Sequence, residues 1–532
     1  MSNPNVYLKP SILVEPLFNQ WYAWPYLIPP ASAAMYIANA HVKIMQSFVA
    51  APQVHISALK NPGMLGGPFI NYDASKVGEI KELAEKTTRE NAHMVQLADA
   101  IKTLDETLAA EANGFSLEGF YQKTPEILRG YVELVYDLQN HPSIRFIEGL
   151  LYKSKYYNRG SQSVVLSEVE SDGRSFVFST PRLKSDGRLY LDLPFEHQGI
   201  DELFKMQFVP QPYGHIRETL NLSEKDDARF AAFFTEEAPQ KNPRYDGDGV
   251  RIRYFGHACV LIETKHVNVL CDPVISSKST SGIDRFTYAD LPESLDYVLI
   301  THTHQDHVMF ESLLHLRHKI KNLIVPKSVG GDRVDPSLKL ILQSVGFKNV
   351  RDLDEMETIE IPDGVITGLP FLGEHADLNV RTKLAWFVKL MGRSIIMAAD
   401  SNNLESKLYE HVHEIYGDVD ILFLGMECEG APMSWLYGPL LTKPLSRKND
   451  QSRRFDGSTS KKGMEIVDIL NPASVYVYAM GQEPWCTFLT SIQYTDESKP
   501  IVESNRLVEE CHGRGIKSER LYGKREMHIE PR

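Results

Sequence analysis

The second half of the chain repeats short apolar runs separated by polar turns and amphipathic stretches. Strands are predicted at the apolar runs 250–254, 258–263, 267–271, 297–300, 323–325, 365–369, 384–390, 394–398, 421–424 and 475–478. Helices are predicted at the amphipathic stretches near 309–318, 337–346, 404–415 and 462–470. Many short strands flanked by helices favour an α/β fold, in which two packed sheets carry helices on both outer faces.

The first half of the chain has a less regular pattern, which is typical of a mixed α+β domain. Residues 78–112 are predicted to be helical, because apolar side chains recur three and four positions apart and Asn113-Gly114 ends the run. This apolar stripe consists of Met94, Leu97, Ile101, Leu104 and Leu108. The stripe packs either into the core of the same chain or against a second copy of it.

Turn signals predict a β-meander further along the first half. Asp172-Gly173 and Asp186-Gly187 are typical hairpin turns between short apolar runs. The three predicted strands are 164–169, 176–178 and 189–193. The first seventy residues are rich in tryptophan, tyrosine and proline, and we expect them to be ordered but irregular.

The segment 236–249 is polar and rich in proline and glycine, which is typical of a linker. We therefore predict a domain boundary there, with an N-terminal α+β domain over 1–245 and a catalytic domain over 246–532. The length of 532 residues suits two to four domains at about 100–200 residues each.

Composition excludes several classes of function. A net charge of -13 argues against nucleic acid as a partner, because phosphate binding needs a basic face. The N-terminus lacks the basic and apolar regions of a secretory signal. The apolar stretch 24–40 is interrupted by Pro25, Pro29 and Pro30, so no membrane span is expected. Five cysteines without CxxC spacing indicate free thiols in a reducing cytoplasm.

The strongest chemical signal is the run His-Thr-His-Gln-Asp-His at 302–307, directly after an apolar run. It places His302, His304, Asp306 and His307 on one turn. Imidazole suits zinc, iron, copper and nickel, and carboxylate adds a harder donor. The spacing lets the first two histidines reach one metal ion while the Asp-His pair reaches a second. Two ions roughly 3.5–4 Å apart form a common catalytic centre.

This motif resembles the signature of the metallo-β-lactamase fold superfamily. The segment 254–263 and the following Asp272-Pro273 are similar to opening strands of that fold. Asp400, after the predicted strand 394–398, matches the bridging aspartate of the family. The resemblance covers about residues 250–490 and implies an αββα sandwich. It leaves the reaction open, because the fold hosts hydrolases, nucleases, lactonases and oxygen-using di-iron proteins.

Two departures from the hydrolase pattern narrow the choice. Where hydrolases of this fold have a histidine before the bridging aspartate, this chain has Leu372-Gly-Glu374-His375. The predicted strand 475–478 leads into 479–483 without the late histidine of the hydrolases. The implied ligands are His302, His304, Asp306, His307, Glu374 and Asp400. Three carboxylates and open coordination positions favour iron and O2 over zinc and water.

Nearly the whole chain resembles the di-iron β-hydroxylases that act on amino acids held as thioesters on carrier domains of nonribosomal peptide synthetases. The resemblance implies two iron ions, O2 as co-substrate, an external electron donor and a homodimer formed through the N-terminal domain. It assigns His302, His304, Glu374 and Asp400 to one iron. Asp306, His307 and the bridging Asp400 are assigned to the other.

Alternatives stay open at this point. A zinc-dependent hydrolase of the same fold would use His375 in place of Glu374, with a metal-bound hydroxide as nucleophile. A flavodiiron oxygen reductase is less compatible, since that family has glutamate at the position of His304. A non-catalytic scaffold that keeps a residual metal motif is a third possibility, and six candidate ligands in the expected order argue against it.

Three further features have two interpretations each. His257 suits a group that orients a ligand better than a ligand itself. Residues 427–429, Glu-Cys-Glu, line the pocket or form an ordinary strand-end loop. The segment 430–462 is a solvated loop or a lid, and its basic side chains could meet an acidic carrier domain or the pantetheine phosphate. These basic residues are Arg447, Lys448, Arg453, Arg454, Lys461 and Lys462.

Overall fold

The computed structural model describes residues 4–169, 171–240, 242–278 and 282–532. Two seven-stranded sheets form the C-terminal part of the molecule. The first has the order β15 (Val350–Leu353), β14 (Ile320–Pro326), β13 (Leu295–Leu299), β12 (Asn268–Cys271), β11 (Cys259–Glu263), β10 (Val250–Gly256) and β23 (Arg525–Ile529). The second has the order β16 (Thr358–Ile361), β17 (Gly364–Leu369), β18 (Ala385–Leu390), β19 (Arg393–Met397), β20 (Ile421–Gly425), β21 (Ser474–Tyr478) and β22 (Lys517–Arg520).

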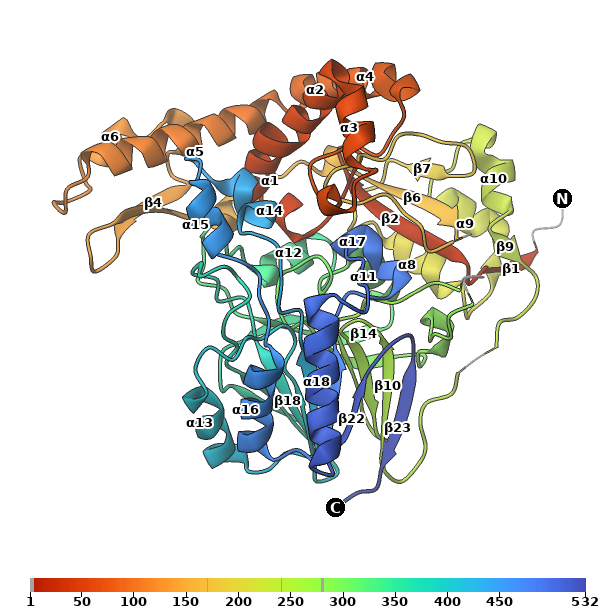
Figure 1. The fold of residues 1–532 in the computed structure, drawn as a ribbon. Helices are drawn as coiled ribbons and strands as arrows, with labels where there is room; N and C mark the ends of the chain where they lie inside the picture. Colours follow the sequence, from red (N-terminus) through yellow and green to blue (C-terminus); the bar gives the residue numbers. More distant parts are fainter. Residues whose placement is uncertain (1–3, 170, 241, 279–281) are drawn as a thin grey trace.

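The two sheets face each other across a core of branched and aromatic side chains, among them Ile252, Val260 and Trp386. Helices cover both outer faces (Figure 1). On the second sheet these are α13 (Lys407–Tyr416), α16 (Ser460–Leu470) and α18 (Lys499–Gly513). On the first sheet they are α11 (Phe310–Leu316) and α12 (Leu338–Ser344). The predicted sandwich of two sheets between helical layers is therefore confirmed.

The N-terminal part combines helices with a four-stranded sheet of order β3-β2-β6-β7. These strands are β3 (Trp21–Tyr22), β2 (Ile12–Phe18), β6 (Gln162–Glu168) and β7 (Leu189–Leu191). The main helices are α1 (Pro30–Tyr36), α2 (Val42–Ala50), α3 (Pro52–Ala58), α4 (Val77–Glu90), α5 (Ala92–Glu111) and α8 (Gln198–Lys205). A projecting arm contains the end of α5, α6 (Phe120–Lys123) and the hairpin of β4 (Val132–Tyr136) and β5 (Pro142–Phe146) (Figure 1).

The prediction of one helix over 78–112 was wrong in one respect, because two helices meet at Asn91. The Asn91 side chain donates to the Thr87 carbonyl oxygen and so satisfies the end of α4. The apolar stripe on α5 lies inside the chain, where each of its five side chains is at most 1% exposed. The stripe is therefore core, and it gives no support to a contact between two copies.

Two other predictions for the N-terminal part were wrong. The run 176–178 is not a strand, because the Val177 amide donates to Phe488 of the C-terminal part instead of to a strand neighbour. The first seventy residues are not irregular, since they form β1 (Asn5–Leu8), β2, β3 and the helices α1 to α3. Tertiary burial of the tryptophans and tyrosines there organises a segment whose prolines suggested otherwise.

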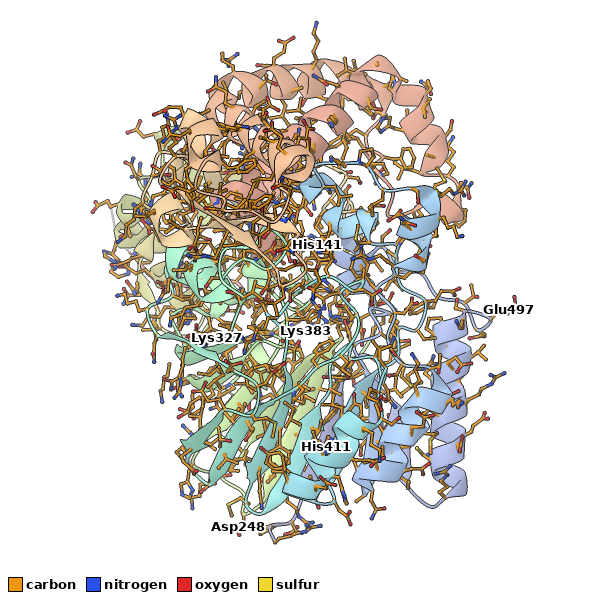
Figure 2. All side chains as sticks on the ribbon, turned by 90° about the vertical axis from the view of Figure 1, so that its left-hand side faces the viewer. His141, Asp248, Lys327, Lys383, His411 and Glu497 are labelled. Atoms are coloured by element: carbon orange, nitrogen blue, oxygen red, sulfur yellow. The ribbon has the colours of Figure 1, made fainter. Side chains whose placement is uncertain are left out.

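The N-terminal part packs directly on the sandwich. One apolar core is continuous between β2, α5 and the helix α11. Arg174 pairs with Glu15 of β2 at 3.0 Å and with Glu311 of α11 at 2.8 Å. The segment 236–249 forms no helix or strand over its described residues, and it passes along the molecule to the far end of the sheets, where Figure 2 places Asp248.

Candidate metal centre

The predicted metal-binding run lies where β13 ends. Backbone and side chain of Thr301 donate to Asp272, which follows the neighbouring strand β12, at 2.7 and 2.6 Å. His302 pairs with Lys383 in an isolated β-bridge to the second sheet. Figure 2 shows Lys383 at the level where the sheets meet the N-terminal part. The turn 302–307 is thus fixed between the two sheets.

Strand ends of the second sheet bring the remaining two candidates to the same place. Asp400 follows β19, and Glu374 lies in the loop after β17. Three groups of side chains have ligand atoms within 4.8 Å of one another. They are His302, His304 and Glu374; His302, His307 and Asp400; and His257, Asp306 and His307. The structure brings all six predicted ligands together, in overlapping groups that share His302 and His307.

Each histidine of the cluster has one ring nitrogen held by a neighbouring side chain. His307 Nδ1 lies 2.8 Å from Asp272 Oδ2, and His302 Nδ1 lies 3.0 Å from Thr301 Oγ1. His304 Nε2 lies 3.1 Å from the Tyr437 hydroxyl. These contacts orient the rings and leave the other nitrogen for a metal ion.

His257 belongs to a candidate metal group, but its hydrogen bonds favour a different role. The Gly481 amide donates to His257 Nδ1 at 3.1 Å, so that nitrogen must be the acceptor. The proton of a neutral ring then resides on Nε2, which lies 3.4 Å from Asp306 Oδ2. A protonated nitrogen cannot bind a metal ion. His257 therefore orients Asp306.

Glu374 and His375 occupy different positions relative to the cluster. Glu374 Oε1 lies 2.9 Å from His304 Nδ1. The His375 Nδ1 lies 3.0 Å from the other oxygen of Glu374, and within the described residues His375 belongs to no group of candidate ligands. Burial opposes ionisation of Glu374, but His304 and His375 outweigh it and lower its pKa to about 2.

Backbone conformation around the cluster is unusual for residues with side chains. Glu374, His257, Asp272 and Ala399, which precedes Asp400, have φ angles of 63°, 49°, 39° and 48°. Left-handed conformations of this kind cost free energy and persist where the surrounding structure enforces them. The loop that carries Glu374 begins at Gly373, where a Cβ atom would lie 2.5 Å from that of Asn402. The ligand loops are therefore held in place by close packing.

The charge balance of the cluster suits cations. Burial, followed by the surrounding histidines, lowers the pKa of His302 well below its usual value, so its ring is neutral and able to bind a metal. Burial raises the pKa of Asp400, although His307 opposes that shift. A cation beside these carboxylates would relieve the unfavourable burial of their negative charge.

Buried atoms without hydrogen-bond partners test whether metal ions fit here. His302 Nε2 and Asp400 Oδ1 are buried and make no hydrogen bond among the described residues. Native proteins rarely leave such atoms unsatisfied, and a bound ion would satisfy them. Imidazole nitrogens together with several carboxylate oxygens are donors that suit iron. The residues therefore fit a dinuclear iron centre.

A cavity of about 550 Å³ opens onto the cluster. Glu427 and Glu429 line this cavity, as the first of the two interpretations of 427–429 expected. Cys428 does not line it. Burial, followed by the charges of Asp400, Asp306 and Glu374, raises the pKa of Glu427 well above normal.

Residues 430–436 and 454–457 of the segment 430–462 form a lid over this cavity, whereas much of 443–452 is exposed to solvent. The segment contains α14 (Ser434–Tyr437) and α15 (Arg447–Ser452), and its side chains Trp435, Arg454 and Phe455 line the cavity. Arg453 donates to the Ala376 carbonyl oxygen beside the Glu374 loop at 2.9 Å.

Sequence reasoning missed the wall contributed by the N-terminal part. Residues 63–69, Gly-Met-Leu-Gly-Gly-Pro-Phe, line the metal cavity, and the Gly66 carbonyl oxygen accepts from Trp435 of the lid. It also missed Tyr437, which holds His304. The glycine-rich composition of 63–67 was visible as a turn signal, but nothing local connects it to a cluster so distant in sequence.

Comparisons with known proteins agree with this geometry. A family model described as the diiron non-heme beta-hydroxylase N-terminal domain matches residues 7–239, and a beta-lactamase superfamily domain matches 267–433. The 4-amino-L-phenylalanyl-CmlP-peptidyl-carrier-protein 3-hydroxylase of Streptomyces venezuelae is 38% identical over 98% of this chain and 99% of its own. A UPF0173 protein of Pyrococcus abyssi is 32% identical over 24% of this chain and 50% of its own.

Two solved structures of similar proteins agree with the sequence comparisons. The crystal structure of CmlA, a diiron beta-hydroxylase from Streptomyces venezuelae, covers 99% of this chain and 100% of its own, with a TM-score of 0.93 and 37% identity. A mutant of CmlA beta-hydroxylase covers 98% of this chain and 100% of its own, with a TM-score of 0.90 and 36% identity.

Fold and site together define a metal-dependent protein of the metallo-β-lactamase fold with an additional N-terminal domain. Within that class, the chain belongs to the diiron non-haem β-hydroxylases. Among the described helices, none has the length and apolar character needed to cross a membrane.

Proposed function

We propose that this protein is an O2-dependent di-iron monooxygenase. It hydroxylates the β-carbon of an amino acid that is tethered as a thioester to a carrier domain of a nonribosomal peptide synthetase. The relative of Streptomyces venezuelae, 38% identical over 98% of the chain, is named as a 3-hydroxylase of an aminoacyl carrier protein. A carboxylate at 374, 2.9 Å from a cluster histidine, is the structural observation on which the proposal rests.

The donor set divides between two iron ions. His302, His304 and Glu374 would hold one ion, Asp306 and His307 the other, and Asp400 would bridge them. When bound, the two irons supply the reduction of O2 that inserts one oxygen atom into a C–H bond and releases the other as water. The chain holds the ligands rigidly, through Asp272, Thr301 and Tyr437.

The cavity walls supply orientation and protection. Trp435, Leu436 and Phe455 provide an apolar wall that limits water around the reacting carbon. Glu427 and Glu429 place two further carboxyl groups in the same cavity. A tethered substrate needs few polar contacts of its own, because the carrier domain already fixes one end of it.

The direct test is hydroxylation of an aminoacyl carrier protein under 18O2 with reductant. We expect a single 18O atom on the β-carbon of the tethered amino acid by mass spectrometry. An 18O label that enters only from water, or a product that forms without O2, would contradict the proposal. The zinc hydrolase is the competing outcome, and it would release the amino acid from its thioester.

Stoichiometry, chain organisation and cysteine content support the remaining parts of the proposal. An external electron donor is required by the stoichiometry of monooxygenation, because O2 needs two electrons beyond those of the C–H bond. The domain boundary at 245/246 is supported by the coil of 236–249, and by family models that end at 239 and begin at 267. Five buried cysteines, none in a disulfide, support a reducing cytoplasmic compartment.

A homodimer remains part of the proposal, with support from a different surface than the sequence suggested. Phe115 and Leu138 are 77% and 97% exposed. Both belong to the projecting arm, where Gly114 lies against Asn140. Exposed apolar side chains on a protruding tip are suited to a contact with a second copy. Sedimentation of the Phe115→Asp and Leu138→Asp double variant should show a monomer where the unaltered chain forms a dimer.

A further inference from the structure

A second cavity, of about 890 Å³, adjoins the metal cavity. Its wall is largely aromatic and comes from both parts of the chain: Tyr22, Trp24, Tyr36, Phe176, Phe178 and Trp435. The two cavities share Gly66, Gly67, Pro68, Pro432, Trp435 and Leu436. Trp435 Nε1 donates to the Gly66 carbonyl oxygen at 2.9 Å, so this contact forms the partition between them.

The outer cavity contains buried polar atoms that have no partner. Tyr22 and His41 line it and are 2% and 3% exposed, and neither the Tyr22 hydroxyl nor His41 Nδ1 makes a hydrogen bond. Burial lowers the pKa of His41 to about 3, so the ring is neutral. A largely aromatic cavity of this size is suited to an extended organic ligand.

His41 lies at the end of a π-helical turn, Ile37–His41, between α1 and α2. Such turns are rare and frequently occur at functional sites. Here the widened turn places Asn39, Ala40 and His41 in one wall of the cavity. The π-helical turn is therefore part of the cavity wall.

Basic side chains surround the same cavity. Lys43, Lys443 and Arg447 are exposed, line it, and form no ion pair among the described residues. Two other charged residues there already have partners. Lys102 lies 3.7 Å from Asp99, and the Asp450 carboxylate accepts from Ser434 at 2.8 and 2.7 Å. An unpaired cationic rim on a chain of net charge -13 favours an anionic ligand group.

We propose that this outer cavity binds the phosphopantetheine arm of the carrier-bound substrate. The phosphodiester lies at Lys43, Lys443 and Arg447, and the arm runs along the aromatic wall that contains Tyr22 and His41. The thioester end reaches the metal cavity along the walls that the two cavities share, beside the Gly66–Trp435 hydrogen bond. This inference rests on the proposed function, and it assigns the arm a site separate from the metal ligands.

Binding of two small probes to the iron-loaded enzyme tests the assignment without requiring turnover. The probes are 4′-phosphopantetheine and pantetheine, which lacks the phosphate, and calorimetry measures both. We expect the phosphorylated probe to bind about tenfold more tightly, since a charge-assisted contact contributes about 1.5–3 kcal/mol. In the Lys443→Ala and Arg447→Ala double variant this preference should disappear.

Lys448→Ala is the matched control, because Lys448 is exposed beside Arg447 but does not line the cavity. It should retain the preference for the phosphorylated probe. Equal affinity for the two probes, failure of both to bind, or an equal loss in Lys448→Ala would each overturn the assignment.

Kinetics on the carrier-bound substrate separate this inference from the proposed function. The double variant should raise KM about tenfold and leave kcat nearly unchanged, because the rim is remote from the reacting carbon. Hydroxylation with an unchanged KM would reject the arm site and leave the proposed function intact. Phosphate-dependent binding without any hydroxylation would reject the proposed function instead.

Discussion

Single side chains that hydrogen-bond to the metal ligands determine how those ligands are oriented. Asp272 accepts from His307 and from both the amide and the hydroxyl of Thr301. Because Thr301 in turn contacts His302, one aspartate orients two histidines of the cluster. The Asp272 backbone, with a φ of 39°, is itself held in a left-handed conformation next to β12.

Asp272→Asn should lower iron affinity about 10–100-fold, which is the usual effect of altering a group that orients a metal-binding histidine. Competition with a chelator measures it. Asp420→Asn is the control, because Asp420 is also buried and hydrogen-bonded, but to Ser394. An equal loss of affinity in both variants would mean that general destabilisation, and not orientation of His307, is responsible.

At the level of elements, the sandwich could be predicted from the sequence because its strands are short, apolar and bounded by turns. The strands β15, β16, β22 and β23 were missed, and so was α18. All four strands lie at sheet edges, and β15 and β16 have only four residues each, so their apolar pattern is short. Such strands are defined by their neighbours in the sheet more than by their own residues.

The candidate site likewise contains residues that could be predicted from the sequence and residues that could not. The cluster 302–307 is contiguous, so its chemistry could be predicted from spacing alone. Glu374 and Asp400 required resemblance to a known family, since each is an isolated carboxylate after a strand. The wall 63–69 and Tyr437 could not be predicted, because only tertiary packing brings them to the cluster.

The stripe on α5 makes a testable distinction between core and interface. Leu104 is 0% exposed within one chain. Leu104→Ala should therefore lower the free energy of unfolding by about 2–5 kcal/mol, without a change in oligomeric state. Glu106→Ala, on the exposed face of the same helix, should have little effect. A shift from dimer to monomer in the Leu104 variant would restore the interface interpretation.

For the molecule as a whole, the function depends on two parts that pack into one body. The metal cavity has one wall from the N-terminal part and another from the lid of the catalytic part. Arg174 connects Glu15 of the former to Glu311 of the latter. We therefore expect the two parts to unfold together. The buried ion pairs of Arg174 should stabilise the contact between them.

Burial opposes ionisation of Glu15, but Arg182 and Arg174 outweigh it and lower its pKa from 4.5 to about 2. A lowered pKa stabilises the fold above the unfolded value, and this contribution is lost as the pH falls from 4.5 toward 2. Glu15→Gln should therefore cost about 3 kcal/mol at pH 7 and progressively less below pH 4.5.

Denaturant unfolding between pH 7 and pH 3 measures the effect of Glu15→Gln. Glu168→Gln is the control, because its pair with Lys9 is exposed and 3.9 Å long, and such pairs contribute about 0–1 kcal/mol. A difference between Glu15→Gln and the unaltered chain that stays constant with pH would show that the ion pairs are not its cause.

The metal content of two single variants decides whether Glu374 or His375 completes the centre. Elemental analysis with an anaerobic optical titration should find two irons per chain in the unaltered protein and in His375→Ala. Glu374→Ala should lose iron, because one ion keeps only histidines and the bridging aspartate. Stoichiometric zinc in the unaltered protein, together with metal loss in His375→Ala alone, would contradict the assignment and identify a hydrolase.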